Sequence, residues 1–262
     1  MHHFCEALHI RYNFAMFRLM CITAHPDDEA GSFGGSLRTY ADRGVETSVV
    51  CLTPGQAGSH RAGAANDQEL AELRKKEFAA SCAILRVAKP VVLDYADGQL
   101  YRQELNRVVY ELVSQIRKFR PQVILTYGSD GGVTGHPDHS MAGIFATLAF
   151  QWAGRSNRYT DQFESGLQPN RGQKLYYSTA DFVLPGRQPV TFAPATAAIE
   201  IGAVLEAKVA AFKAHITQQP LWSVFEGNVR KRGPQETFHL AAAVKQPPLE
   251  METDLFAGIA ED

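Results

Sequence analysis

Two short stretches combine histidine and aspartate around a proline, and each follows an apolar run of the chain. They are AHPDDE at residues 24–29 and GHPDH at residues 135–139. Imidazole nitrogen and carboxylate oxygen are ligands that Zn²⁺ favours, and three protein ligands with one open position are typical of a catalytic zinc site. His25, Asp28 and His139 meet that count. The two stretches therefore predict a catalytic metal site, provided that the fold brings them together.

Helix capping is a simpler explanation of the first stretch. Pro26 suits the first turn of a helix, and the acids at positions 27–29 suit the positive end of the helix dipole. Capping accounts neither for His25 nor for the glycines at 31, 34 and 35, which weaken an ordinary helix. A surface loop with incidental histidines would explain the second stretch alone, but the repeat of the pattern favours a shared site.

Adjacent Asp27 and Asp28 are expected to have different roles, because the side chains of neighbouring residues diverge. One would bind the metal, and the other would face a metal-activated water and accept its proton. Spacing alone does not assign the two roles.

The elements that must position these residues follow from periodicity. Short apolar runs alternate with helical patterns over the first 150 residues. The expected strands are Phe17–Thr23, Thr47–Leu52, Pro90–Leu93 and Val123–Tyr127, and the expected helices cover residues 70–85 and 105–119. This alternation predicts an α/β fold with a Rossmann-like, mostly parallel layered sheet and helices on both faces. In such sheets the first and fourth strands meet where the strand order reverses, and ligands bind there.

The C-terminal part is expected to add strands and a helix to the same domain, which spans residues 1–262. We expect a strand at Lys174–Thr179, a helix at Gly202–Ala214 and a last edge strand at Glu236–Ala243. Residues 154–173 are polar and predict a loop or lid. Residues 1–15 predict an N-terminal extension, with Met16 or Met20 as alternative starts, and residues 247–262 predict a loosely held tail.

Composition narrows the class of partner. A formal net charge of −2 over 262 residues lacks the basic footprint of a nucleic-acid binder. No apolar run reaches the roughly 18 residues of a membrane span. The four cysteines form no CxxC pair, which favours buried thiols in a cytoplasmic protein. We therefore expect a cytoplasmic protein with a small-molecule substrate, either monomeric or a homo-oligomer.

With both motifs present, the chain resembles the LmbE-like, PIG-L-type family of zinc-dependent N-deacetylases. Further segments agree with the family: LTPGQAGS at 52–59, ELRKKEF at 72–78, DYADGQL at 94–100 and KVAAFKAHITQQ at 208–219. The resemblance covers most of the chain and independently implies a Rossmann-like fold. It implies that His25, Asp28 and His139 bind Zn²⁺, with Fe²⁺ as another candidate, and that Asp27 is the general base.

The resemblance also implies roles around the metal. His136 would polarise the substrate carbonyl or its oxyanion, and Asp138 would orient His136. Arg74, Asp97 and His215 would contact substrate, with His215 at the rim of the site. Without the resemblance, the sequence would place Arg74 on a solvated helix face, Asp97 in a turn and His215 on a helix surface.

Two departures from the family pattern weaken assignment to one pathway: Gln56 stands where glutamate is frequent, and Thr134 where some members have tyrosine. The predicted reaction is hydrolysis of an N-acetyl group from an N-acetylglucosamine-type sugar. An amidase of the same family acting on a thiol-sugar conjugate is the first alternative. A non-haem Fe(II) enzyme and a metal-stabilised sugar-binding module are the others. Residues 154–173 and 218–233 are expected to select the substrate.

Overall fold

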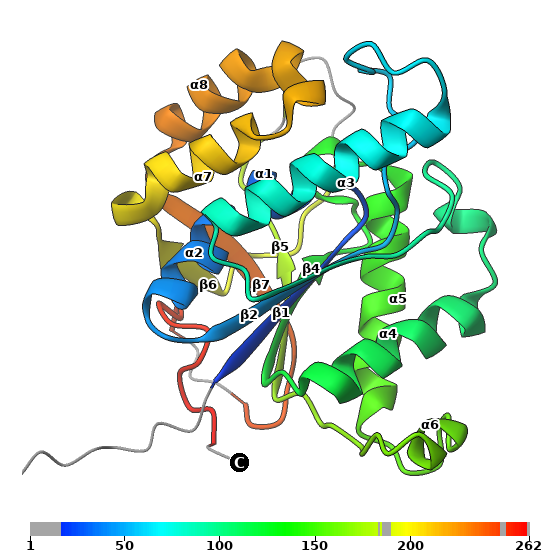
Figure 1. Cartoon of the computed structure of the whole chain (residues 1–262). Coiled ribbons are helices and arrows are strands. Elements are labelled where there is room, and N and C mark those ends of the chain that lie inside the picture. The colour runs from blue at the N-terminus through cyan, green and yellow to red at the C-terminus, as the bar shows by residue number, and fades with distance from the viewer. Residues whose placement is uncertain (1–16, 183, 185–189, 247–249, 261–262) are drawn as a thin grey trace, which may run out of the picture.

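The computed structural model describes residues 17–182, 184, 190–246 and 250–260 (Figure 1). The predicted N-terminal extension at 1–15 and the alternative start at Met16 lie outside the described residues, whereas Met20 lies within the first strand.

A single seven-stranded sheet forms the centre of the fold, in the order β3-β2-β1-β4-β5-β7-β6. Its strands are β1 Arg18–Thr23, β2 Glu46–Cys51, β3 Lys89–Val92, β4 Val123–Tyr127, β5 Lys174–Ser178, β6 Ala197–Glu200 and β7 Gln235–Ala243. The first five strands pair in parallel, and β7 runs antiparallel to both β5 and β6. The predicted α/β fold with a mostly parallel sheet is confirmed.

Helices cover both faces of this sheet (Figure 1). Their bounds are α1 Asp28–Gly31, α2 Gly34–Asp42, α3 Asp67–Ile84, α4 Leu105–Phe119, α5 Pro137–Ala153, α6 Asp161–Glu164, α7 Leu205–Lys213 and α8 Trp222–Arg232. Side chains of α4 and α5 pack with Met20 and Ile22 of β1 in one core. Side chains of α2, α3 and α7 pack with Leu19 and Cys21 in the other. Because β1 is buried on both faces, its sequence is a nearly continuous apolar run.

Two expectations for the C-terminal part are corrected. The strand at the sheet edge is β6, not β7, which lies between β5 and β6. With only four residues, β6 is too short for a clear alternation in the sequence. The predicted helix at 202–214 begins as a single 3-10 turn over Gly202–Val204, and α7 proper starts at Leu205.

The described part of the tail, residues 250–260, is held against the sheet rather than loose. Glu252 is buried and accepts from Lys174 Nζ at 2.6 Å and from the Tyr176 hydroxyl. Leu255 is fully buried in the core. Residues 247–249 and 261–262 lie outside the described part.

Residues 154–173 lie at the amino ends of the strands, because they connect the C-terminus of α5 to the start of β5. In Figure 1 their short helix α6 lies at the opposite end of the molecule from α8. The segment is organised by the buried guanidinium of Arg117. This group donates to Gln162 Oε1 and to the backbone carbonyls of Ala153, Arg155, Arg158 and Tyr159. None of residues 154–173, all of which the structure describes, lines the cavity beside the two motifs, so the expectation that this segment selects substrate is wrong.

Cys21, Cys51 and Cys82 are buried free thiols, as predicted, and burial raises the pKa of each. Cys5 lies outside the described residues. In the described part of the chain, none of the helices is both long and apolar enough to cross a membrane.

Candidate active site

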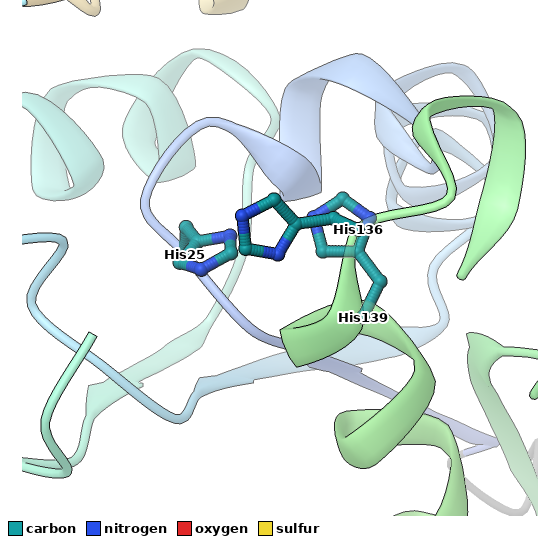
Figure 2. Close-up of side chains that lie close together, drawn as sticks. All are labelled: His25, His136 and His139. Carbon is teal, nitrogen blue, oxygen red and sulfur yellow. The ribbon is translucent and has the colours of Figure 1, made fainter. Parts of the chain in front are cut away.

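The two motifs meet at the carboxyl ends of β1 and β4, which are neighbours in the sheet. His25 follows β1, and His136 and His139 lie at the start of α5. Figure 2 shows the three imidazoles grouped at this edge of the sheet. Ring centroids of His25 and His139 are 5.3 Å apart, and those of His25 and His136 are 4.8 Å apart. Residues more than a hundred positions apart thus share one site, as the sheet topology predicts.

A close approach of α5 to β4 places the second motif. Pro137 occupies the first turn of α5, and His136 is its N-cap. A Cβ at Gly143 would lie 2.2 Å from the carbonyl oxygen of Tyr127, so only glycine permits this contact. The first turn of α5 is consequently seated directly at the carboxyl end of β4.

Hydrogen bonding fixes which nitrogen of His139 could bind a metal. Its Nδ1 lies 3.1 Å from the carbonyl oxygen of Gly131, and Tyr127 stacks on the ring at a centroid distance of 4.2 Å. A carbonyl only accepts, so Nδ1 carries the proton and donates. Nε2 faces Asp28, whose Oδ1 is 3.1 Å away, so without a metal it donates to that carboxylate, and its lone pair is available only when a metal takes the place of this proton.

His25 is oriented by two carboxylates in the same way. Its Nε2 lies 3.1 Å from Asp97 Oδ1 and 3.4 Å from Asp138 Oδ2, so this nitrogen is the donor. Its Nδ1, on the other side of the ring, lies 3.7 Å from Asp28 Oδ2 and becomes a possible metal ligand when the ring is neutral. Asp28 therefore stands between one ring nitrogen of each of two histidines. A histidine whose second nitrogen donates to a carboxylate or a carbonyl is typical of metal sites.

The electrostatics of this cluster suit a cation. Burial alone would raise the pKa of Asp28, but His139 and His25 outweigh it and hold that pKa well below its usual range. Burial would likewise lower the pKa of His25, yet Asp138 and Asp97 raise it to about 10. Three buried carboxylates around one imidazole thus create a site with a strong preference for positive charge.

Two groups of potential ligand atoms each lie within 4.8 Å of one another: His25, His136 and His139, and His25, Asp97 and Asp138. Both groups contain His25. Mixed imidazole and carboxylate donors fit Zn²⁺ or Fe²⁺. Neither group contains Asp28, which faces His25 and His139 through the contacts given above. The donor chemistry therefore fits a divalent transition metal beside His25.

Asp27 is presented to the cavity by an unusual backbone. Its φ is +117°, a conformation that residues with side chains rarely adopt. Its Oδ2 accepts from Arg74 Nη2 at 2.9 Å. Burial raises the pKa of Asp27 to about 6, although Arg74 opposes that rise.

Arg74 points into the protein rather than forming a solvated helix face. Besides Asp27, its guanidinium contacts the carbonyl oxygens of Pro26 and of Gly55, the latter at 3.2 Å. Gly55 makes room, since a Cβ there would lie 2.4 Å from Nη1 of Arg74. Arg74 lines the cavity, and its described hydrogen bonds join the loop that carries Asp27 to the loop at Gly55.

His136 lines the cavity, and a hydrogen bond from the backbone of α5 determines its tautomer. Its Nδ1 accepts from the backbone amide of Asp138 at 3.1 Å, so Nε2 carries the proton of the neutral ring. Burial lowers the pKa of His136, which favours that neutral form. The carboxylate of Asp138 was expected to orient His136, but it accepts instead from the amides of Gly98 and Leu100. It is the Asp138 backbone that orients His136.

The site opens into a cavity of about 1130 Å³. Its polar end contains the two motifs, and part of its wall comes from Gln218 and from apolar side chains of α8, including Val224 and Phe225. Residues 218–233 therefore face the cavity, as expected. His215 was expected at the rim, but it is fully buried and its Nε2 lies 2.7 Å from Glu29 Oε1.

Four residues near the site were not identified from the sequence. Tyr127 stacks on His139, and Thr134 Oγ1 lies 3.3 Å from its Nδ1. Glu29 and Ser81 form a buried contact behind Asp27. Glu29 carried a signal as the last residue of AHPDDE but was read as a capping acid, and Thr134 was noted only as a departure from the family pattern.

Similarity to known proteins agrees with this fold. The family model described as PIG-L, GlcNAc-PI de-N-acetylase, matches residues 20–150. A 1D-myo-inositol 2-acetamido-2-deoxy-alpha-D-glucopyranoside deacetylase 2 of Catenulispora acidiphila is 31% identical over 92% of this chain and 97% of its own length. The diacetylchitobiose deacetylase of Thermococcus kodakarensis is 32% identical over 81% of this chain and 75% of its own.

A solved structure is also similar. The N,N'-diacetylchitobiose deacetylase of Pyrococcus horikoshii superposes with a TM-score of 0.73 at 25% identity, over 85% of this chain and 83% of that one. Fold and site thus define an α/β protein with a mixed histidine and carboxylate centre at the strand ends. The chain belongs to the PIG-L family, which is also called LmbE-like.

Proposed function

We propose that the protein is a zinc-dependent hydrolase that removes the N-acetyl group from an N-acetylglucosamine-type sugar or its conjugate. The observation that carries this proposal is the position of Asp28 between His25 Nδ1 and His139 Nε2, with Asp27 beside it facing the cavity. Relatives named as deacetylases of amino sugars support the substrate class.

His25 through Nδ1, Asp28 and His139 through Nε2 would hold the metal, with Asp97 and Asp138 accepting from the other nitrogen of His25. A Zn²⁺ ion held there would supply Lewis-acid chemistry, lowering the pKa of a water molecule to about 7 and polarising the amide carbonyl. Fe²⁺ would fit the same donors.

The residues around the metal site carry out proton transfer and stabilise the oxyanion. Asp27 accepts the proton of the attacking water, and Arg74 fixes the carboxylate for that step. Nε2–H of His136 donates to the oxyanion that develops on the amide oxygen. Asp27 then returns the proton to the leaving nitrogen, so acetate and a free amine are released.

Other activities compete with this one. A thiol-sugar conjugate contains the same amide chemistry and is the nearest alternative substrate. An Fe(II) oxygenase would require an oxidant, and a sugar-binding module would need no base such as Asp27. We propose a cytoplasmic location, consistent with the buried free thiols.

Acetate release tests the proposed function. We expect the zinc-loaded protein to release acetate from at least one of N-acetylglucosamine, its α-glycosides and diacetylchitobiose, without oxygen. Metal content is measured on the same sample. Oxygen-dependent turnover, or sugar binding without any release of acetate, would contradict the proposal.

His136→Ala tests the oxyanion donor. Because removing one such donor typically costs about 100-fold or more, kcat should fall by that factor while the metal stays bound. His239→Ala is a matched control, since His239 lies on β7 and bonds to the carbonyl of Pro194. Near-normal kcat in His136→Ala would remove His136 from the mechanism.

A further inference from the structure

The backbone of Asp27 has a strained conformation that neighbouring groups must stabilise. With φ at +117°, this residue adopts a conformation that persists only where its surroundings impose it. Its peptide N–H donates to Oε2 of Glu29 at 3.0 Å. Since the direction of a side chain follows from the backbone that carries it, this contact also aims the Asp27 carboxylate.

Glu29 is itself fixed from two other elements. Its Oε1 accepts from the Ser81 hydroxyl at 2.5 Å and from His215 Nε2 at 2.7 Å. All three side chains are fully buried. Ser81 lies on α3, and His215 lies in the turn after α7, so one carboxylate joins three separate segments behind Asp27. We call Ser81, Glu29 and His215 the Glu29 network.

This network complements the contact with Arg74. Arg74 holds the carboxylate of Asp27 from the cavity side, and the Glu29 network holds the peptide from within the core. None of its three residues lines the cavity in the described part of the chain. Burying a carboxylate costs free energy unless its oxygens accept hydrogen bonds. One of the bonds that Glu29 accepts comes from the peptide N–H of Asp27, the base.

We infer that Ser81, Glu29 and His215 are positioning residues for the base Asp27, an inference that rests on the proposed function. They touch neither the cavity nor the reacting atoms. Their effect on turnover passes through the main chain of Asp27, whose carboxylate must lie within reach of the attacking water. His215, which was expected at the rim of the active site, is therefore assigned a positioning role from within the core.

Three variants of the full-length zinc-loaded protein test the inference. Glu29→Gln puts an amide donor against either the Asp27 N–H or the two donors on Oε1. His215→Leu removes one donor at similar volume, and Ser81→Ala is the mildest change if the other variants do not fold. A misplacement of about 1 Å can cost 100-fold, so kcat should fall roughly 10- to 100-fold in the first two variants and less in Ser81→Ala.

The inference also predicts what stays constant. KM and zinc content should remain within about twofold of wild type, because an interaction that acts only on the base changes kcat. His215→Gln restores a donor toward Glu29 and should recover part of kcat. A role in stability alone would predict no such split between kcat and KM.

Glu77→Gln is the matched control. Glu77 is also a buried acid on α3. It accepts from the backbone amide and the hydroxyl of Thr217, two residues after His215, at 2.9 and 2.7 Å, and none of its described hydrogen bonds reaches Asp27. It should lower the melting temperature and leave kcat unchanged. Wild-type kcat in zinc-loaded His215→Leu and Ser81→Ala, or an equal loss in Glu77→Gln, overturns the inference. No acetate release by the wild type would instead overturn the proposed function itself.

Discussion

Asp28→Ala is expected to lose its metal and, with it, all measurable acetate release. Asp28 is the carboxylate between His25 Nδ1 and His139 Nε2, and among the described residues it is the only one that pairs with both histidines. Without it, two imidazoles remain, which is fewer than the three protein ligands of a catalytic zinc site. Metal per chain, measured by plasma emission after dialysis, should fall from about one to near zero.

Two further variants sharpen this result. Oδ2 of Asp28 also accepts from the amides of Ala24 and His25. Asp28→Asn can keep those bonds through its remaining oxygen, so it should retain the fold and still lose the metal. Asp97→Asn alters an acceptor for His25 Nε2, can keep the bond from the Ala57 amide through its remaining oxygen, and should weaken metal binding about 10- to 100-fold. An unchanged zinc content in Asp28→Asn would contradict the ligand assignment.

Asp27→Asn should leave the metal in place and stop turnover. Asparagine has nearly the same shape and can still accept from Arg74, but it cannot take a proton from water. General-base catalysis is typically worth about 10²- to 10⁴-fold, so kcat should fall by a factor in that range. Single-turnover acetate release and zinc content, measured on one preparation, separate this loss from metal loss.

Asp94→Asn is the control for that change, since Asp94 is an exposed aspartate on a nearby loop. Its kcat should equal that of the wild type. Turnover of Asp27→Asn within about threefold of the wild type would fall far short of a general-base effect and exclude Asp27 as the base. Equal metal loss in Asp27→Asn and Asp28→Asn would contradict the division of roles between them.

The convergence of the two motifs was predictable from the sequence because it depends on topology. Alternating strands and helices specify parallel pairing with crossovers, and this pairing places the ends of β1 and β4 side by side. The apolar runs of both strands are long and clear. Residues 25 and 139 therefore had to lie at the same edge of the sheet once the fold class was known.

The direction of individual side chains was not predictable in this way. Arg74 turns inward because Gly55 leaves space for it, and His215 turns inward because buried Glu29 accepts from it. Both depend on contacts between segments far apart in the chain. The place of residues 154–173 was missed for another reason: a polar composition indicates a loop but does not say at which end of the sheet it lies.

The central claim is that His25, Asp28 and His139 hold one divalent cation, and anomalous scattering at the zinc edge tests it most directly. In crystals of the zinc-loaded protein, we predict one strong peak at about 2.0–2.2 Å from His25 Nδ1, an Asp28 oxygen and His139 Nε2. A peak bounded instead by His25 Nε2, Asp97 and Asp138, or no peak at this edge of the sheet, would contradict the account.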